Sequence, residues 1–355
     1  SNFLFAWSVW HIMAGGNRIE KGLAAQVINI AKLPSEFYHE FLIFTRLGNS
    51  PLVLENTVDN LIIEPTDGFI LVSTVNQTNH LAEIQLLNLR SLQVIQRWQP
   101  EFSQLENTNI SNANIRLTHP LLFHEDVITN ANGLLIRLNK KSGIVWKNNG
   151  NFHHSIELDA EKNLWVCGTI PPRDTDNIIE SNILDDAIIK IDALTGKTIF
   201  TKSIYEILIE NGYQSLLFNM GPITEDLIHI NDIQPALNSS QYWQKGDILI
   251  SLRNRSSILL YRPSTNKVVW LKTGPWNFQH DCDFISDTEI GVFGNDVTDF
   301  KGKSYLIKGH NNQYIYNFST NEISTPYTKM FKQGKIKTLT EGRSRILPDG
   351  QLLVE

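Results

Sequence analysis

The residues best suited to chemistry are histidines and arginines that recur at the start of similar segments. His280 is followed by Asp281 within residues 274–296, just before a run of alternating apolar residues that predicts a short strand. When the similar segments are aligned on their first turn, other polar residues fall at or near the position of His280: Asn60, His119, His154, Asn231 and Arg343. His153 and His229 lie beside two of these positions, so the pattern predicts a ring of polar side chains at one rim of the fold.

A histidine cluster permits two kinds of chemistry. Neutral imidazoles bind transition metals, whereas imidazoles beside a cation can hold an anion and act as nucleophile, acid or base. Arg253 lies on the second predicted strand of the segment that begins at His229, so it can return to the same rim. Because a permanent cation repels a metal ion but forms forked hydrogen bonds to sulfate or phosphate, the sequence favours an anion site without metal or cofactor.

Alternative interpretations remain open for several of these residues. His119 precedes Pro120 and can be structural, and Arg343 can be a charge on the surface of the fold. Asp281 can orient the imidazole of His280 or can cap a turn.

Groups of short strands must position these residues. Strand patterns recur in groups of four that begin near residues 58, 119, 153, 229 and 280, and a further group begins at 343. A helix is expected within 203–213, and three groups end alike, in a turn and a strand that reaches an aromatic residue: Ser142–Trp146, Thr195–Phe200 and Thr265–Trp270. Units of about 40–60 residues with four strands are typical of β-propellers, whose innermost strands line a central channel. The chain is therefore predicted to be all-β, a six-bladed β-propeller over residues 58–355 whose last blade is incomplete in this chain.

The N-terminal region has a different composition. Residues 3–14 are almost wholly apolar, but a bilayer span needs about 20 residues, so residues 1–16 are predicted to be the end of a membrane anchor or signal-like segment. A buried or amphipathic helix is the alternative. Apolar residues at helical spacing predict a helical spacer over residues 17–57. These features predict a periplasmic or extracytoplasmic domain that contacts a membrane through its N-terminal segment.

Composition excludes some classes of function. The 355-residue chain is 41% hydrophobic, enough for a large core, and has a net charge of −6 with no dense Lys/Arg run, which argues against nucleic acid as a partner. Cys167 and Cys282 are too few for a disulfide framework.

Five segments carry a resemblance to a known family: His153–Glu157, His229–Ile233, Ser251–Asn254, Phe278–Asp281 and Glu341–Gly350. In their order and placement the sequence resembles the bacterial arylsulfotransferases of the membrane-anchored propeller type, from about residue 58 to the end. The resemblance implies a six-bladed propeller and transfer of a sulfuryl group from a phenolic sulfate ester to a phenol. It also implies a sulfated histidine as intermediate and no nucleotide sulfate donor.

The resemblance also implies roles for single residues. His280 would be the nucleophile, and His154, His229 and Arg253 would contact the sulfuryl group and the phenolic oxygens. Trp276 is a candidate wall for the phenol, with core packing as the alternative. The predicted substrate-binding set contains His153, Asn231, His119, Arg343 and Trp276. Aryl sulfates and phenols are the expected small-molecule partners.

Two other functions compete with this hypothesis. A non-catalytic propeller that binds a sulfated or phenolic ligand, or a protein partner at the membrane, would bind without turnover. A metal-binding propeller oxidoreductase would contain stoichiometric metal. Arg253 and the resemblance favour the sulfotransferase.

Overall fold

The fold is known from a computed structural model that describes residues 68–76, 78–105, 115–171, 183–220, 224–300, 303–347 and 349–354. All of these residues belong to one unit, Asn60–Glu355. The predicted anchor (1–16), the predicted spacer (17–57) and Asn60 lie outside the described residues.

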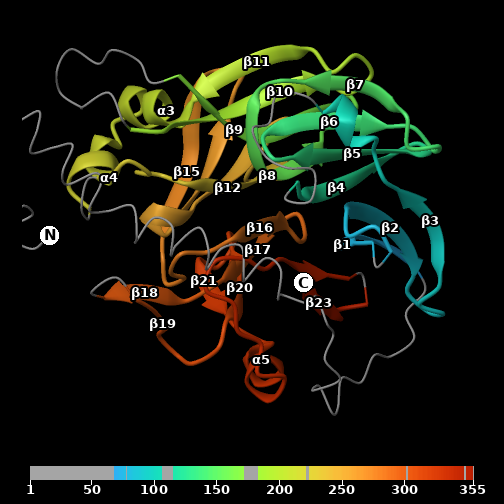
Figure 1. The fold of residues 1–355 in the computed structure, drawn as a ribbon. Coiled ribbons are helices and arrows are strands. Elements are labelled where there is room, and N and C mark those ends of the chain that lie inside the picture. Colours follow the sequence, from blue (N-terminus) through green and yellow to red (C-terminus); the bar gives the residue numbers. More distant parts are fainter. Residues whose placement is uncertain are drawn as a thin grey trace, which may run out of the picture. The chain divides into compact units, whose positions relative to one another are not determined.

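The described residues form five antiparallel sheets of three or four strands, the blades of a β-propeller (Figure 1). Blade 1 contains β1 (Phe69–Val75), β2 (Ala82–Asn88) and β3 (Val94–Trp98), followed by the short helix η1 (Phe102–Gln104). Blade 2 contains β4 (Leu117–Phe123), β5 (Asp126–Ala131), β6 (Leu134–Leu138) and β7 (Ile144–Asn148). Blade 3 contains β8 (Asn151–Leu158), β9 (Asn163–Ile170), β10 (Asp185–Asp192) and β11 (Thr198–Ser203).

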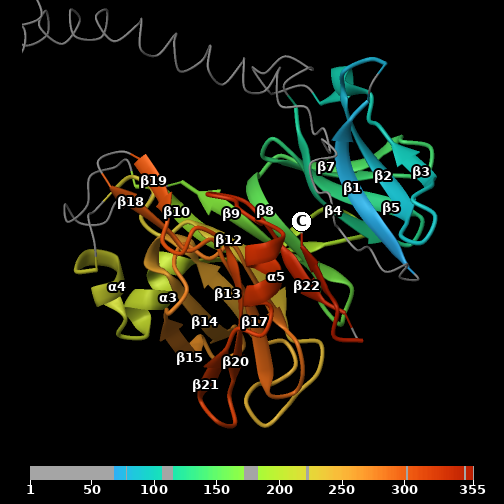
Figure 2. The ribbon, with the colours of Figure 1, turned by 90° about the horizontal axis from the view of Figure 1, so that it is seen from below.

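The chain then adds two helices and two more blades. The helices are α3 (Ile204–Glu210) and α4 (Gln214–Phe218). Blade 4 contains β12 (Ile230–Pro235), β13 (Ile248–Leu252), β14 (Ser257–Arg262) and β15 (Lys267–Thr273), with η3 (Arg253–Arg255) after β13. Figure 2 shows these four strands side by side in chain order. Blade 5 contains β16 (Asp281–Phe284), β17 (Glu289–Gly294), β20 (Asn312–Asn317) and β21 (Glu322–Ser324).

Apolar patterning explains which strands lie inside each blade. All five residues of β13 are buried, because this strand is covered on both faces. On the outer strand β7, buried Trp146 lies between exposed Val145 and exposed Lys147, as expected where one face meets solvent.

The first strand of each blade is the innermost, as the sequence predicts. β4 contacts β8, β8 contacts β12, and β12 contacts β16. Side-chain oxygens join these strands across the blade boundaries: Ser155 Oγ accepts from Ile233 N, and Asp232 Oδ2 accepts from Cys282 N, both at 2.9 Å. Residues at the start of the first strands are therefore brought together from neighbouring blades.

Aromatic residues at the ends of outer strands connect neighbouring blades. Trp146 donates its Nε1–H to Ala193 O of blade 3 at 3.0 Å. Its ring covers Gly196, which has a φ of +72° and where a Cβ would lie 2.6 Å from the ring. Glycine is required at this turn because it removes both the steric clash and the cost of a left-handed backbone.

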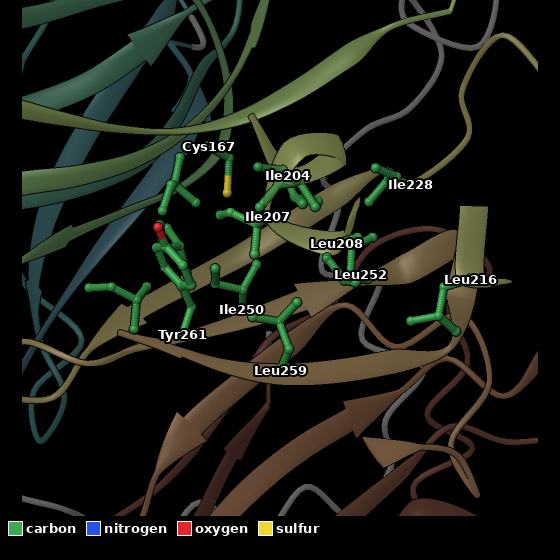
Figure 3. Packing of buried hydrophobic residues seen from close by; sticks show 14 of the residues in the cluster. Cys167, Ile204, Ile207, Leu208, Leu216, Ile228, Ile250, Leu252, Leu259 and Tyr261 are labelled. Atoms are coloured by element: carbon green, nitrogen blue, oxygen red, sulfur yellow. The ribbon is translucent and has the colours of Figure 1, made fainter. Parts of the chain in front are cut away.

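An apolar cluster fills the space between α3, blade 3 and blade 4 (Figure 3). Ser203 caps α3 by accepting from Glu206 N, which turns Ile207 and Leu208 toward β13 and β14. Leu227 and Ile228 belong to the same cluster, and each buried side chain of this size contributes about 1.5–3 kcal/mol. The cluster therefore anchors the segment that leads into β12.

The structure adds elements that the sequence pattern did not predict. They are the hairpin of β18 (Val297–Phe300) and β19 (Lys303–Leu306), and α5 (Thr328–Gln333). After the five blades, β22 (Ser344–Ile346) pairs with β23 (Leu352–Val354) as a two-stranded hairpin. The all-β propeller is confirmed with five blades in the described residues, and a complete sixth blade stays a prediction.

Candidate functional site

Four histidines from blades 2 to 5 gather around His154, and we call these five residues the histidine cluster. The ring centroid of His154 lies 5.0 Å from that of His229, 5.3 Å from that of His280 and 5.1 Å from that of His153. His119 lies at the edge of the cluster, with its centroid 6.2 Å from that of His154. The fold thus brings together the histidines that the alignment of the repeats singled out.

The backbone at the start of the inner strands is irregular, and this irregularity places the histidines. His119, His154 and His229 have φ values of 49°, 54° and 54°, which are uncommon for residues with a side chain. Register shifts occur at the same places, between Thr118 and Leu121 and between His153 and Ile156. Such bulges re-aim side chains away from the regular alternation of a strand.

Burial keeps three of the histidines neutral. The pKa of His280 is lowered to about 3, first by burial and then by the charge of Arg253. Burial is also the main cause that lowers the pKa of His154 and that of His119, with neighbouring histidines adding to it. A neutral imidazole keeps a lone pair, so these side chains are bases or nucleophiles at neutral pH.

The other two histidines are paired with carboxylates. His229 Nδ1 lies 2.5 Å from Asp226 Oδ2. His153 Nε2 lies 3.4 Å from Asp186 Oδ1, and His153 Nδ1 lies 2.9 Å from His154 Nδ1. A neutral His153 that donates Nε2–H to Asp186 accepts at Nδ1 from His154, which leaves the lone pair of His154 on Nε2.

Arg253 supplies a permanent positive charge next to the cluster. It is the first residue of η3, and its backbone N–H bonds to His229 O at 3.1 Å. The guanidinium carbon lies 4.6 Å from the ring centroid of Phe278, and Nη1 donates to Asn254 Oδ1 at 2.9 Å. Burial lowers the pKa of Arg253 while the charges of Asp299 and Asp226 oppose this effect, and a guanidinium stays charged in proteins.

A second group of ionisable residues lies on the same inner strands and was not predicted. We call Glu157, Asp232, Asp281 and Asp283 the carboxylate cluster. Burial raises the pKa of Glu157, that of Asp283 and, to about 7, that of Asp232, and the mutual repulsion of the carboxylates adds to each rise. The sequence pattern does not predict this cluster, because Glu157, Asp232 and Asp283 lie on three different inner strands and meet only in the folded chain.

Arg343 joins the two clusters. Its Nη2 lies 3.3 Å from Glu157 Oε1 and its Nε lies 3.5 Å from Asp281 Oδ1. Its Nη1 lies 3.5 Å from His119 Nδ1. Asp281 Oδ2 also accepts from Ser344 N at 3.0 Å, so this carboxylate binds the 343–344 segment.

Two further residues of the predicted site lie near His280. Trp276 is near it in the sequence, and Asn231 is near it across the boundary between blades 4 and 5. Asn231 is buried and donates Nδ2–H to Gln279 O at 2.9 Å, while its Oδ1 has no hydrogen-bond partner within the described residues. Trp276 is fully buried, and its ring centroid lies 6.1 Å from that of Tyr314. Asn231 therefore offers an acceptor near the cluster, whereas Trp276 lies in the core.

His280 has spare hydrogen-bonding capacity. Its Nδ1 is buried and lacks a hydrogen-bond partner among the residues that the structure describes. The side chain is only 5% exposed, so a ligand would have to supply the missing partner. Within the same described ranges, no group of three or more His, Cys, Asp or Glu residues is arranged to hold a metal ion.

Comparison with protein families shows to which family the chain belongs. A sequence model of the arylsulfotransferase (ASST) family matches residues 119–355, more than half of the chain. The chain belongs to the arylsulfotransferase family. The match includes every residue of both clusters, and it confirms the family that the motifs indicated.

Comparison with solved structures gives distant similarities only. A Bacteroides caccae protein of unknown function is 11% identical, with 80% of this chain and 81% of that chain covered and a TM-score of 0.49. The Neurospora crassa Pan2 WD40 domain is 10% identical, with 73% and 62% covered and a TM-score of 0.43. Kuenenia stuttgartiensis hydrazine synthase is 10% identical, with 72% and 62% covered and a TM-score of 0.44. No curated protein matches the chain.

Membrane contact was predicted for a part of the chain that the structure does not describe. None of the helices in the described ranges is long and apolar enough to cross a bilayer.

Proposed function

We propose that this arylsulfotransferase moves a sulfuryl group from a phenolic sulfate ester to a phenolic acceptor through a sulfated His280. The observation that carries the proposal is a neutral, 5% exposed imidazole with a free ring nitrogen beside the permanent charge of Arg253. Membership of the family supports aryl sulfates and phenols as the substrates.

The first half-reaction forms a bond between nitrogen and sulfur. A lone pair of His280 attacks sulfur, and the bond from sulfur to the phenolic oxygen breaks with its electron pair on that oxygen. Because the pKa of His280 is about 3, protonation does not block this lone pair at neutral pH. No nucleotide donor takes part.

Arg253 offsets the charge of the group in transfer. A sulfuryl group carries negative charge on its non-bridging oxygens throughout the reaction. Arg253 is held by Phe278 and Asn254, so its guanidinium is oriented before the substrate binds. Preorganised cations of this kind stabilise the transition state more than a mobile side chain does.

Histidines of the cluster handle the proton. Protonated His229 donates a proton to the departing phenolic oxygen, or His154 does so after it has itself taken up a proton, and general acid catalysis of this kind is typically worth about 10²–10⁴-fold. In the second half-reaction the acceptor phenol returns a proton to the same side chain while its oxygen takes the sulfuryl group from His280. The two halves therefore balance, and the enzyme returns to its first state.

The substrate-binding residues form the remainder of the proposal. Asn231 Oδ1 lies where it can contact a polar atom of the substrate, and His119 with Arg343 lies at the edge of the cluster. Contact of His153 with a substrate requires that one of its nitrogens exchange its present partner, Asp186 or His154, for the substrate. Contact of Trp276 with a phenol requires that its buried side chain become accessible. We also propose a sixth blade and an extracytoplasmic location with an N-terminal anchor, on the apolar composition of residues 3–14.

Intact-mass analysis with a chromogenic aryl sulfate tests the function. Wild-type protein mixed with donor alone should release one phenolate per protein and gain the mass of one sulfuryl group, which added phenol should remove. Peptide mapping should place the label on His280, and His280→Asn should abolish both signals. Binding of the ester without release or label, in folded wild-type protein, would contradict the proposal and favour the binding module.

A further inference from the structure

We propose that Asp226 positions His229 and makes it the proton carrier of the transfer reaction. The inference rests on the proposed function and deepens it, because the family resemblance and the geometry of the rings leave the choice between His229 and His154 open. Asp226 lies in the segment before β12 and contacts no other histidine of the cluster within the described residues.

The contact between Asp226 and His229 fixes the tautomer of the imidazole. Asp226 Oδ2 lies 2.5 Å from His229 Nδ1, and a carboxylate at this distance accepts the Nδ1–H. Nε2 on the opposite side of the ring is then the nitrogen that exchanges a proton with the substrate. The carboxylate also stabilises the imidazolium that forms when Nε2 takes up a proton.

The segment that carries Asp226 is anchored on both sides. Leu227 and Ile228 are each 1% exposed and lie in the apolar cluster of α3 and blade 4, where Figure 3 shows Ile228. Asp226 O accepts from Asn254 Nδ2 at 2.8 Å and from Thr224 Oγ1 at 2.9 Å. The backbone of Asp226 is thus held in place by groups other than the histidine that its carboxylate contacts.

Asn254 links this pair to Arg253. Its Oδ1 accepts from Arg253 Nη1 at 2.9 Å while its Nδ2 donates to Asp226 O. The backbone repeats the connection, because Arg253 N bonds to His229 O and Asn254 N bonds to Ile228 O. The cation for the sulfuryl oxygens and the histidine for the phenolic oxygen are therefore held at a fixed spacing.

The other histidines lack an equivalent arrangement. His280 and His119 contact no carboxylate oxygen through a ring nitrogen in the described part of the chain, and the Nδ1 of His154 is engaged with His153. His153 has Asp186 on one nitrogen and His154 on the other, so neither nitrogen is free for a substrate. His229 alone among the described histidines of the cluster combines a carboxylate on one nitrogen with a free second nitrogen.

The proton transfer is balanced by this arrangement. His229 begins this step as an imidazolium. As the bond from sulfur to the phenolic oxygen breaks, the proton on His229 Nε2 moves to that oxygen, and Nδ1 keeps its hydrogen, which stays bonded to Asp226 Oδ2 throughout. When the acceptor phenol attacks the sulfated His280, its proton returns to His229 Nε2. Asp226 itself neither gains nor loses a proton.

The dependence of rate on the leaving group tests the inference. Asp226→Asn removes the charge but keeps the shape, and we expect a loss in kcat of about 10²-fold for unsubstituted phenyl sulfate. A nitrophenyl sulfate needs little protonation of its leaving oxygen, so its loss should stay below about threefold. Glu225→Gln, an exposed neighbour with the same change of charge, is the matched control and should leave both rates unchanged.

A double-mutant cycle and the tautomer of His229 show whether Asp226 positions His229 or only supports the local structure. If Asp226 acts through His229, Asp226→Asn should add no further loss to His229→Gln. Nitrogen-15 NMR of histidine-labelled protein, recorded with His229 in its neutral form, should show the Nδ1–H tautomer of His229 in the wild type and its loss in Asp226→Asn.

The outcomes distinguish failure of the inference from failure of the function. Equal losses for phenyl and nitrophenyl sulfates, or an unchanged tautomer in Asp226→Asn, would overturn the role of Asp226. If wild-type protein turns over no aryl sulfate, the proposed function fails, and the NMR result still decides whether Asp226 sets the tautomer of His229.

Discussion

The histidine cluster and the carboxylate cluster lie on or beside neighbouring inner strands, but their hydrogen-bonding groups are satisfied in opposite ways. β8 carries His154 and Glu157, and β16 carries Asp281 directly after His280. His280 Nδ1 lacks a partner within the described residues, whereas Asp281 binds both Arg343 and Ser344 N. Neighbours in sequence thus have different tasks, and the side chain with spare hydrogen-bonding capacity is the one fitted to receive a substrate.

The two arginines show the same difference. Arg343 contacts Glu157 and Asp281, so its charge is largely neutralised by the protein. Arg253 contacts a neutral amide and an aromatic ring, so its charge remains available to an anion. One arginine supports the fold and the other is suited to catalysis, a distinction that mutation can test.

The largest effect is expected from Arg253→Met. Loss of a preorganised cation should reduce kcat/KM for an aryl sulfate by about 10²–10³-fold, while the free energy of unfolding changes little. Steady-state kinetics and urea unfolding measure the two quantities. Arg253→Lys should recover only part of the rate because it lacks the forked donor geometry. An intact rate in Arg253→Met would remove Arg253 from the mechanism.

Arg343→Met should lower the free energy of unfolding more than it lowers kcat/KM, the opposite of Arg253→Met. It leaves Asp281 buried without its cation, and because Arg343 itself is partly exposed we expect a loss of about 2–3 kcal/mol in the free energy of unfolding. Urea unfolding at neutral pH measures this loss. Unchanged stability together with a raised KM would instead show that Arg343 binds substrate, as the sequence analysis predicted.

Asp232→Asn tests the carboxylate cluster through pH. The pKa of Asp232 is about 7 in the folded protein against an ordinary value of 3.8, so between these values the folded state binds more protons. The contribution of Asp232 to the free energy of unfolding is therefore most favourable at low pH, and it becomes less favourable as the pH rises toward 7. The variant should be more stable than wild type by about 1–3 kcal/mol at pH 8 and by much less at pH 5.

The histidine cluster should respond to pH in the reverse direction. The pKa of His280 is lowered to about 3 from 6.5, so the unfolded state binds more protons between these values and stability falls as the pH drops through that range. Unfolding curves of Asp232→Asn and His280→Asn from pH 4 to pH 8 compare the two effects. Parallel curves for both variants would contradict the contrast between the clusters.

Inorganic sulfate should give the smallest effect. If the site near Arg253 binds sulfate, a concentration ten times Kd stabilises the folded state by about 1.4 kcal/mol, a shift of a few degrees in Tm. Calorimetry should show this shift in wild type and its absence in Arg253→Met. A shift that persists in Arg253→Met would place the anion elsewhere.

Much of the fold could be predicted from the sequence because propeller strands are short and periodic. The apolar runs around 134–138 and 257–261 correspond to β6 and β14. The β18–β19 hairpin was missed because it is an insertion that interrupts blade 5 and shares no pattern with the other blades. The repeat also predicted that the histidines would meet, since residues at the same place in successive blades lie on one rim.

The partners of the histidines could not be predicted in the same way. Asp226 lies in a segment before β12, and Asp186 lies on β10, so neither occupies the repeat position. Their roles depend on tertiary distances that sequence spacing does not contain. Trp276 shows the limit again, because proximity to His280 in the chain does not reveal that its side chain turns into the core.

The bonds from Asp281 to residues 343 and 344 have a consequence for biosynthesis. During translation the histidines are all made before Arg343 leaves the ribosome. Until that residue docks, Asp281 and Glu157 lack their cation, and Asp281 also lacks its bond from Ser344 N. We therefore expect the nascent polypeptide to be inactive and to become reactive only when the segment that contains Arg343 has folded into place.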